Sequence, residues 1–168
     1  MELLIVVALI MILSVVGIGS YTQAVVKSKD TQRKSDLNQL AKAVEAFNSD
    51  LSRYPLSMAG EDYIHCYVKS SGTITNPTCV SNKLNAVIDG ARTDYIVMPT
   101  DPDPSQKYVY ISTDGRTFAL YAALENTSDK DLLKLSNGSP NLDPWGISCG
   151  SLKCNYKITE VGLAKTDE

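Results

Sequence analysis

The residues whose chemistry says most about this chain are its four cysteines, Cys66, Cys79, Cys149 and Cys154. They could bind a metal ion or form disulfides. No two of them have the CxxC spacing typical of zinc sites, and His65 is the only histidine. Two disulfides are therefore favoured, which indicates an oxidising compartment outside the cytoplasm. The sequence does not choose among the possible pairings. We favour Cys66–Cys79 and Cys149–Cys154, because each bond would close a turn-rich loop.

Enzyme chemistry has little support in the sequence. His65 directly precedes Cys66, and adjacent side chains rarely point the way a Cys–His pair requires. There is no GxSxG elbow, P-loop or HExxH motif. Three aspartates, at positions 101, 103 and 143, offer oxygen ligands suited to calcium. Each of them precedes a proline, however, which is ordinary turn chemistry. The sequence therefore predicts a protein that is not an enzyme and has no cofactor or bound metal.

The charges are balanced along most of the chain, with 16 Lys and Arg against 19 Asp and Glu and a net charge of −3. Specific nucleic-acid binding is disfavoured, because it requires clustered basic side chains. The only basic run comprises Lys27, Lys29, Arg33 and Lys34, which alternate with polar residues on a predicted helix. We interpret this run as a solvated helix face.

Residues 3–19, LLIVVALIMILSVVGIG, carry no charge, and their length is near the lower limit for a helix that spans a bilayer. The segment is apolar on every face, which argues against a core helix. A signal peptide would need a positive start, whereas Glu2 is negative. A membrane anchor is the favoured interpretation. The mean hydropathy of −0.10 conceals this segment, because the polar remainder cancels it.

Three residues in this region have a candidate role in assembly. Glu2 would be favourable at the positive end of the helix dipole if that end lies in water. If the segments of many copies pack together, Glu2 would be buried and would need a cationic partner. Gly17 and Gly19 each cost a helix about 1 kcal/mol relative to alanine. They mark either a small-residue packing site or a place where the helix melts, and we favour packing.

An amphipathic helix is predicted to continue directly from the apolar segment. Apolar residues recur at alternating intervals of three and four, at Leu37, Leu40, Val44, Phe47 and Leu51. Pro55 ends the pattern, so residues 2–53 could form one helix. We interpret the stripe as a core face against the following domain, since it covers too few heptads for a coiled coil. The predicted organisation is a helix over 1–54, with an apolar part (1–21) and an amphipathic part (22–54), and a disulfide-containing head over 55–168.

The head is predicted to contain short strands over 94–98, 107–112 and 117–124, and a late strand near 155–158. Asp114 and Gly115 lie in a hairpin turn between the second and third of these strands. Residues 99–104 are predicted to form a rigid corner. Tyrosines in the strands suit a sheet that packs against the helix stripe, and the region after Ser128 is predicted to be mostly loop. The predicted fold class is α+β, with a long N-terminal helix on a small antiparallel sheet.

The first third of the chain carries a family resemblance. ELLIVVALIMILSVVGIGSY, followed by an amphipathic stretch that ends in SDLSRYP, resembles the N-terminal helix of type IV pilins and type II secretion pseudopilins. The resemblance implies a pilin-like fold and a basic leader removed by a prepilin peptidase, with methylation of the new terminal amine. It also implies that Glu2 pairs with the terminal amine of a neighbouring subunit. The helix-breaking proline common in the family is missing here.

The removed leader would resolve a conflict in the sequence. The positive charges that follow the apolar segment would place the remainder of the chain in the cytoplasm, whereas the cysteines indicate the outside. The resemblance implies a chain held in membrane lipid by its helix, with the head outside, until a membrane platform and its motor ATPase assemble it into a helical homopolymer at the cell surface.

The leading hypothesis is therefore a structural subunit of an extracellular type IV pilus, with roles in adhesion, motility or DNA uptake. One alternative is a pseudopilin of a type II secretion system. Another is a membrane-tethered extracellular binding domain. Glu2 favours a filament over the tethered domain, because a monomer has no use for a carboxylate at the start of an apolar segment.

Overall fold

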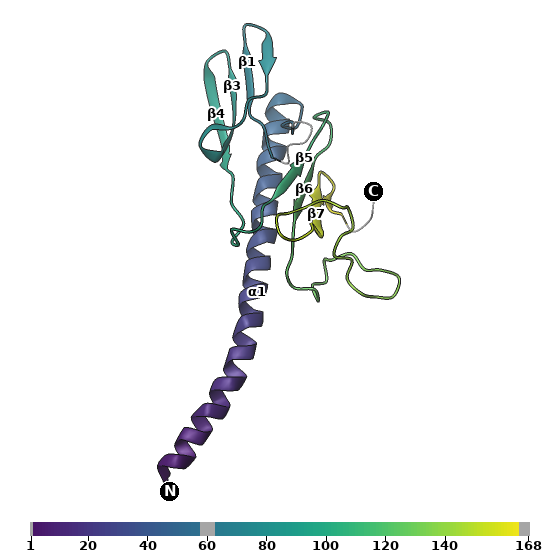
Figure 1. Cartoon of the computed structure of the whole chain (residues 1–168). Coiled ribbons are helices and arrows are strands. Elements are labelled where there is room, and N and C mark those ends of the chain that lie inside the picture. The colour runs from purple at the N-terminus through teal and green to yellow at the C-terminus, as the bar shows by residue number, and fades with distance from the viewer. Residues whose placement is uncertain (1, 58–62, 165–168) are drawn as a thin grey trace.

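The computed structural model describes residues 2–57 and 63–164, and within the long helix the side chains of residues 2, 13 and 15–20 are outside the description. The helix, α1 (Glu2–Leu51), has 50 residues, which corresponds to about 75 Å at the standard rise. Its N-terminal half extends alone, and the head packs against its C-terminal half (Figure 1). The prediction of one helix over residues 2–53 is confirmed to within two residues.

The end of α1 has a local cause. Ser52 adopts a positive φ of 55°, and its N–H donates to the Asn48 carbonyl at 2.7 Å. A left-handed residue at this position ends a helix, and Pro55 shortly afterwards prevents the chain from resuming it.

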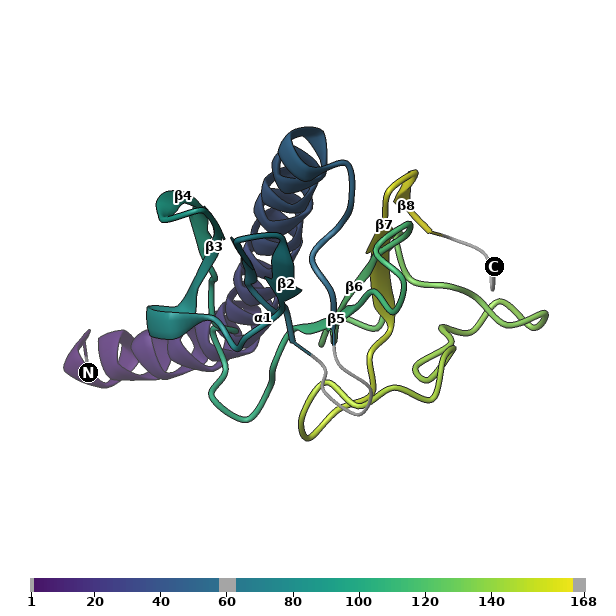
Figure 2. The ribbon, with the colours of Figure 1, turned by 90° about the horizontal axis from the view of Figure 1, so that it is seen from above.

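The first sheet lies on one side of the helix (Figures 1 and 2). Its strands are β1 (Tyr67–Ser70), β2 (Thr73–Thr75), β3 (Lys83–Ile88) and β4 (Ala91–Val97). They are ordered β2-β1-β3-β4, and a short 3-10 turn, η1 (Val80–Asn82), precedes β3. β1 and β3 are parallel, whereas the other neighbours are antiparallel.

The second sheet lies on the other side of the helix (Figure 2). Its strands are β5 (Val109–Ile111), β6 (Ala119–Ala122), β7 (Tyr156–Thr159) and β8 (Gly162–Leu163). They are ordered β5-β6-β7-β8, and all neighbours are antiparallel.

The α+β class is confirmed, but the prediction of a single antiparallel sheet is wrong. The hairpin between β5 and β6 and the late strand β7 occur where the sequence predicted strands. β4 pairs within the first sheet and β5 within the second, so the proline-rich corner over 99–104 crosses between sheets. β1, β2, β3 and β8 were not predicted, because they are short and mix polar with apolar residues without a clear alternation.

The helix stripe forms the core between the two sheets. Leu37, Leu40, Val44 and Phe47 are buried, and Leu51 packs at the edge, which confirms the prediction of a core face. The Phe47 ring contacts that of Tyr95 at a centroid distance of 5.2 Å. Burial of this stripe is what fixes the head on the upper part of α1.

Two disulfides are present, Cys66–Cys79 and Cys149–Cys154, in the sequential pairing favoured from the sequence. The first joins the start of the first sheet to the segment before η1. The second closes a short loop ahead of β7, and it packs with Val109 and Tyr121 in a small second core.

Candidate assembly surface and the ion-pair cluster at the base of the head

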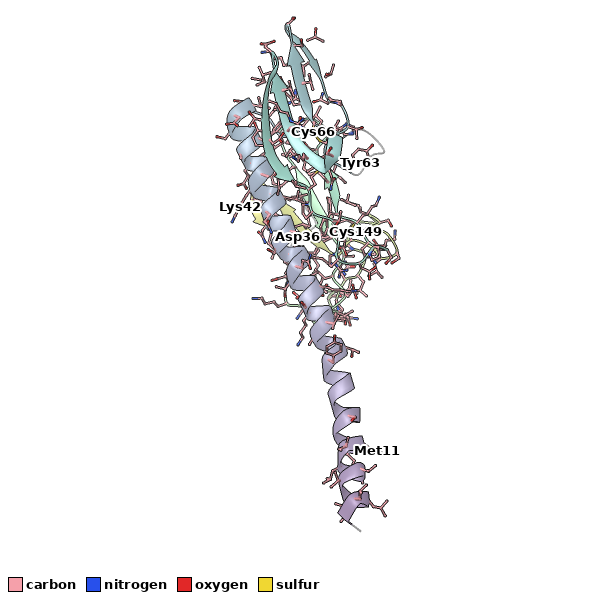
Figure 3. All side chains as sticks on the ribbon, turned by 90° about the vertical axis from the view of Figure 1, so that its left-hand side faces the viewer. Met11, Asp36, Lys42, Tyr63, Cys66 and Cys149 are labelled. Carbon is pink, nitrogen blue, oxygen red and sulfur yellow. A yellow bond between two sulfur atoms is a disulfide. The ribbon has the colours of Figure 1, made fainter. Side chains whose placement is uncertain are left out.

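The apolar segment, defined here as residues 3–12 of α1, is exposed on all sides. Leu3 is 77% and Ile12 63% exposed, and Met11 lies far from the head (Figure 3). The exposed large side chains are Leu3, Leu4, Ile5, Val6, Val7, Leu9, Ile10, Met11 and Ile12. Because successive positions point all around the helix, this segment has no polar face to present to water.

In the part of the chain that the structure describes, no helix is both long enough and apolar enough to cross a membrane. The hydroxyl of Ser14, which follows the apolar segment, donates to the Ile10 carbonyl at 2.8 Å, so it is satisfied within the helix.

The candidate assembly residues lie at this end of α1. The side chain of Glu2 is outside the described part. Gly17 and Gly19 lie within the uninterrupted helix. The structure therefore tests neither the packing nor the melting interpretation of the two glycines, and the role of Glu2 stays a prediction.

Between the apolar segment and the core stripe, α1 buries charged side chains. Asp30, Arg33 and Asp36 are the buried residues of the helix over 21–36. Arg33 is 0% exposed, so the interpretation of this basic run as a solvated helix face is wrong at that position. A buried charge requires close partners, because its hydration is lost.

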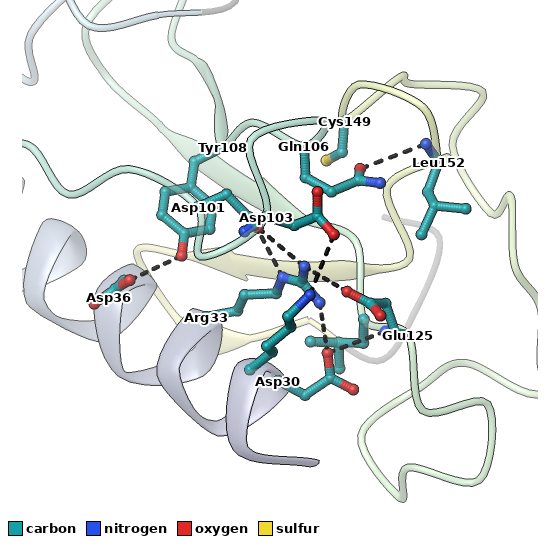
Figure 4. A network of polar contacts seen from close by, with 12 residues as sticks. Asp30, Arg33, Asp36, Asp101, Asp103, Gln106, Tyr108, Glu125, Cys149 and Leu152 are labelled. Atoms are coloured by element: carbon teal, nitrogen blue, oxygen red, sulfur yellow. Dashed lines mark hydrogen bonds and ion pairs between the residues drawn. The ribbon is translucent and has the colours of Figure 1, made fainter. Parts of the chain in front are cut away.

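Arg33 finds its partners in three carboxylates from three segments of the chain (Figure 4). Its Nε and Nη2 donate to the two carboxylate oxygens of Asp101, each at 2.9 Å. Nη2 also donates to Glu125 at 2.7 Å, and Nη1 to Asp30 at 2.9 Å. Burial lowers the pKa of Arg33, but these hydrogen bonds more than compensate and raise it above its ordinary value, so the guanidinium stays charged.

Asp30 and Asp36 connect the helix further to the head. The Asp30 carboxylate accepts the backbone N–H groups of Glu125 at 3.0 Å and Asn126 at 2.8 Å. Asp36 accepts the hydroxyl of Tyr108 at 2.8 Å. Burial raises the pKa of Tyr108, and the bond to Asp36 raises it further, so this phenol remains a donor.

Two lysines extend the cluster towards solvent. Lys34 Nζ lies 2.6 Å from an Asp129 oxygen and 2.7 Å from an Asp131 oxygen. Burial lowers the pKa of Lys34, but the hydrogen bonds to these carboxylates raise it overall. Lys29 pairs with Asp103 at 3.3 Å. We call the whole set the base cluster: Asp30, Arg33, Asp101 and Glu125 at its centre, with Lys29, Lys34, Asp103, Asp129 and Asp131 around them.

The base cluster bears on the calcium hypothesis. Asp101 and Asp103 direct their oxygens at Arg33 and Lys29, while Asp143 lies 3.8 Å from Lys153. In the described ranges, no group of three or more His, Cys, Asp or Glu side chains is arranged to hold a metal ion.

The predicted inertness of the His65–Cys66 pair has a structural counterpart. Cys66 is in a disulfide. The Nδ1 of His65 lies 3.1 Å from the Asn76 carbonyl, to which it donates, and its ring stacks on that of Tyr63 at 5.1 Å. Both side chains are committed to the fold, so they do not form a nucleophile–base pair.

Comparison with family models, with curated proteins and with solved structures gave no match to this chain. The candidate function therefore rests on the chemistry of the apolar segment and of the head.

The buried charges of the helix were not predicted from the sequence, although a signal for them was present. Asp30 and Arg33 precede Leu37 and Leu40 at the same alternating intervals of three and four as the apolar stripe itself. The stripe therefore continues towards the N-terminus through charged residues. Its N-terminal part, at Asp30 and Arg33, faces carboxylates and backbone N–H groups, and its part from Leu37 onward faces apolar side chains.

The charges of the base cluster predict that the stability of the fold against urea depends on pH. Hydrogen bonds from the backbone N–H and hydroxyl of Ser105, together with Lys29, lower the pKa of Asp103 to about 2. A carboxyl whose pKa is lower in the folded than in the unfolded state stabilises the fold at any pH above its unfolded-state pKa. This stabilisation is lost as the pH falls through the pKa of the folded state. We expect Asp103→Asn to lower the urea midpoint at about pH 5, and the difference from wild type to narrow as the pH approaches about 2.

The measurement is urea unfolding of the full chain in a neutral detergent, followed by the fluorescence of Trp145, the only tryptophan. A difference between variant and wild type that stays constant from pH 5 to pH 2 would show that the Asp103 carboxylate does not stabilise the fold through its charge.

Proposed function

We propose that this chain is a structural subunit of an extracellular filament of the type IV pilin kind. The proposal rests on the exposed apolar segment at the end of a helix whose other half packs against a folded head. A surface of this kind is covered in a working protein, since exposed apolar area costs on the order of 25 kcal/mol per 1,000 Å². Packing against the same segment of other copies covers it on every side.

The head supports an extracellular role. Two disulfides staple its first sheet and its C-terminal loop. Disulfides persist in oxidising compartments, so they favour a head that lies outside the cytoplasm. In the proposed filament, the apolar segments form the core and the heads form the surface, where roles in adhesion, motility or DNA uptake would be located.

The membrane stage of the proposal rests on the uncharged sequence over 3–19. Before assembly the chain is held in lipid by this segment, with its head outside. A prepilin peptidase and a membrane platform with its motor ATPase are the partners that the resemblance implies. The finished filament is a helical homopolymer in which the carboxylate of Glu2 pairs with the terminal amine of a neighbour.

Two other functions remain in competition. A pseudopilin of a type II secretion system would use the same helix in a short filament, and it is distinguished by filament length. A membrane-tethered extracellular binding domain would use the helix as an anchor only. A groove of about 280 Å³ beside β5 and β6, lined by Leu40, Met98 and Tyr108 among others, is the place where such a domain would take a ligand.

The test is fractionation of cells that hold a pilus assembly platform and express the full chain. The cells are sheared, the released material is sedimented, and the chain is detected with an antibody raised against the head. We expect a large fraction of the chain in the sheared, sedimentable material, and loss of that fraction when the motor ATPase is removed. Retention of the whole population in the membrane, with or without the ATPase, would contradict the filament and favour the tethered domain.

A further inference from the structure

The base of the head differs from the rest of the molecule in what holds it to α1. Two connections lie there, residues 99–107 and 125–131, and neither contributes a buried apolar side chain. The facing helix over 21–36 buries only charged residues. From Leu37 onward, the helix contributes apolar side chains to the core, and near the helix end the Tyr95 hydroxyl donates to Asp50 at 2.9 Å. The base is therefore attached by ion pairs and hydrogen bonds, and the upper head by the hydrophobic core.

The carboxylates of the base cluster serve the helix and the connections at the same time. Asp101 binds Arg33 and also accepts the backbone N–H of Asp103 at 2.8 Å. Asp129 binds Lys34 and also accepts the backbone N–H of Asp131 at 2.9 Å. These backbone hydrogen bonds, like those from Glu125 and Asn126 to Asp30, depend on carboxylates that the helix cations hold in place.

We propose that the base cluster is a latch, in which Arg33 holds both connections against α1. When its ion pairs break, the two connections separate from the helix together, as one unit. The two sheets and the hydrophobic core stay folded. Arg33 joins the two connections, because it binds Asp101 in one of them and Glu125 in the other. Without it, the buried carboxylate of Asp101 would lose the cation it pairs with and keep only the backbone N–H of Asp103, and release of the connection to water relieves that cost. The open state frees the helix from Tyr21 to Asp36 from the head.

This inference does not rest on the proposed function, and it is tested on the full chain in neutral detergent micelles. Amide hydrogen exchange is measured residue by residue by NMR in wild type and in Arg33→Gln. We expect the amides of Asp103, Glu125, Asn126 and Asp131 to exchange at least about tenfold faster in the variant. The amides of β1, β3 and β6 keep their wild-type rates.

The matched control is Arg92→Gln. Arg92 also pairs with an aspartate, Asp94 at 2.6 Å, but its side chain is 48% exposed on the first sheet. We expect this variant to leave the exchange of the four reporter amides unchanged. Faster exchange of these amides in both variants would show that they respond to any lost charge, and it would overturn the latch.

Lys34→Gln tests whether the two connections open together, and it also serves if Arg33→Gln does not fold. Lys34 contacts Asp129 and Asp131 in one connection, and none of its ion pairs reaches residues 99–107. If the connections open as one unit, this variant accelerates exchange at Asp103 as well as at Asp131, by a smaller factor than Arg33→Gln. Three outcomes would overturn the proposal. In Lys34→Gln, faster exchange could be confined to the amide of Asp131. Alternatively, exchange rates could rise equally throughout the head, or they could stay unchanged in both Lys34→Gln and Arg33→Gln.

Discussion

Glu2→Ala reduces the yield of filaments at least about 100-fold while the amount of the chain in the membrane stays at the wild-type level. In the proposed filament the Glu2 carboxylate is buried among apolar helices, where it neutralises the terminal amine of a neighbouring copy. Removal of one partner from a buried ion pair costs about 3–5 kcal/mol, and about 1.4 kcal/mol corresponds to a factor of ten in an equilibrium. Filament yield is measured by quantitative electron microscopy and by immunodetection of sheared material.

The matched control is Glu45→Ala, which removes an exposed carboxylate from the other end of the same helix. This variant is expected to assemble like wild type. The two substitutions change helix propensity and net charge by the same amount, so a difference between them isolates the position of the carboxylate. Normal assembly of Glu2→Ala would show that Glu2 has no part in subunit contacts.

Phe47→Ala is expected to lower the free energy of unfolding of the head by about 3–5 kcal/mol. Phe47 is buried in the core between α1 and the first sheet, where its ring contacts those of Tyr67 at 6.2 Å and Tyr95 at 5.2 Å. Truncation removes these contacts and leaves a cavity that the helix and the disulfide-linked sheet have little freedom to close. Urea unfolding of the full chain in neutral detergent, followed by Trp145 fluorescence, measures the loss.

Two further variants serve as controls for the loss of stability expected in Phe47→Ala. Lys42→Ala changes an exposed residue of the same helix (labelled in Figure 3) and should alter stability by less than about 0.5 kcal/mol. Phe47→Leu retains most of the side-chain volume and should cost less than Phe47→Ala. Equal stability of Phe47→Ala and Lys42→Ala would mean that the first sheet does not depend on this contact.

The helical half of the fold was predictable because its signals are local. The alternating intervals from Leu37 to Leu51 identify one buried helix face, and Pro55 limits the helix. The Asp114–Gly115 turn likewise identifies the β5–β6 hairpin. Each of these patterns lies within a short window of sequence, so no information about distant segments is needed.

The rest depends on contacts between distant residues. Arg33 is 68 positions from Asp101 and 92 from Glu125, and no local pattern shows that these carboxylates converge on it. From its charge alone, a residue such as Arg33 is predicted to be exposed to solvent. Only its spacing, which places it on the same helix face as the apolar stripe, indicates that it is buried. Strands β1, β2 and β3 of the first sheet were missed for a related reason, since β1 pairs in parallel with β3 across an intervening strand and a 3-10 turn.

The most direct test of the filament is helical reconstruction by electron cryo-microscopy of fibres sheared from cells that express the chain. We expect fibres built from this chain, with the apolar segments of α1 packed together in the core and the disulfide-linked heads on the outside. Fibres that lack the chain, or fibres in which its apolar segment does not contact other copies, would contradict it.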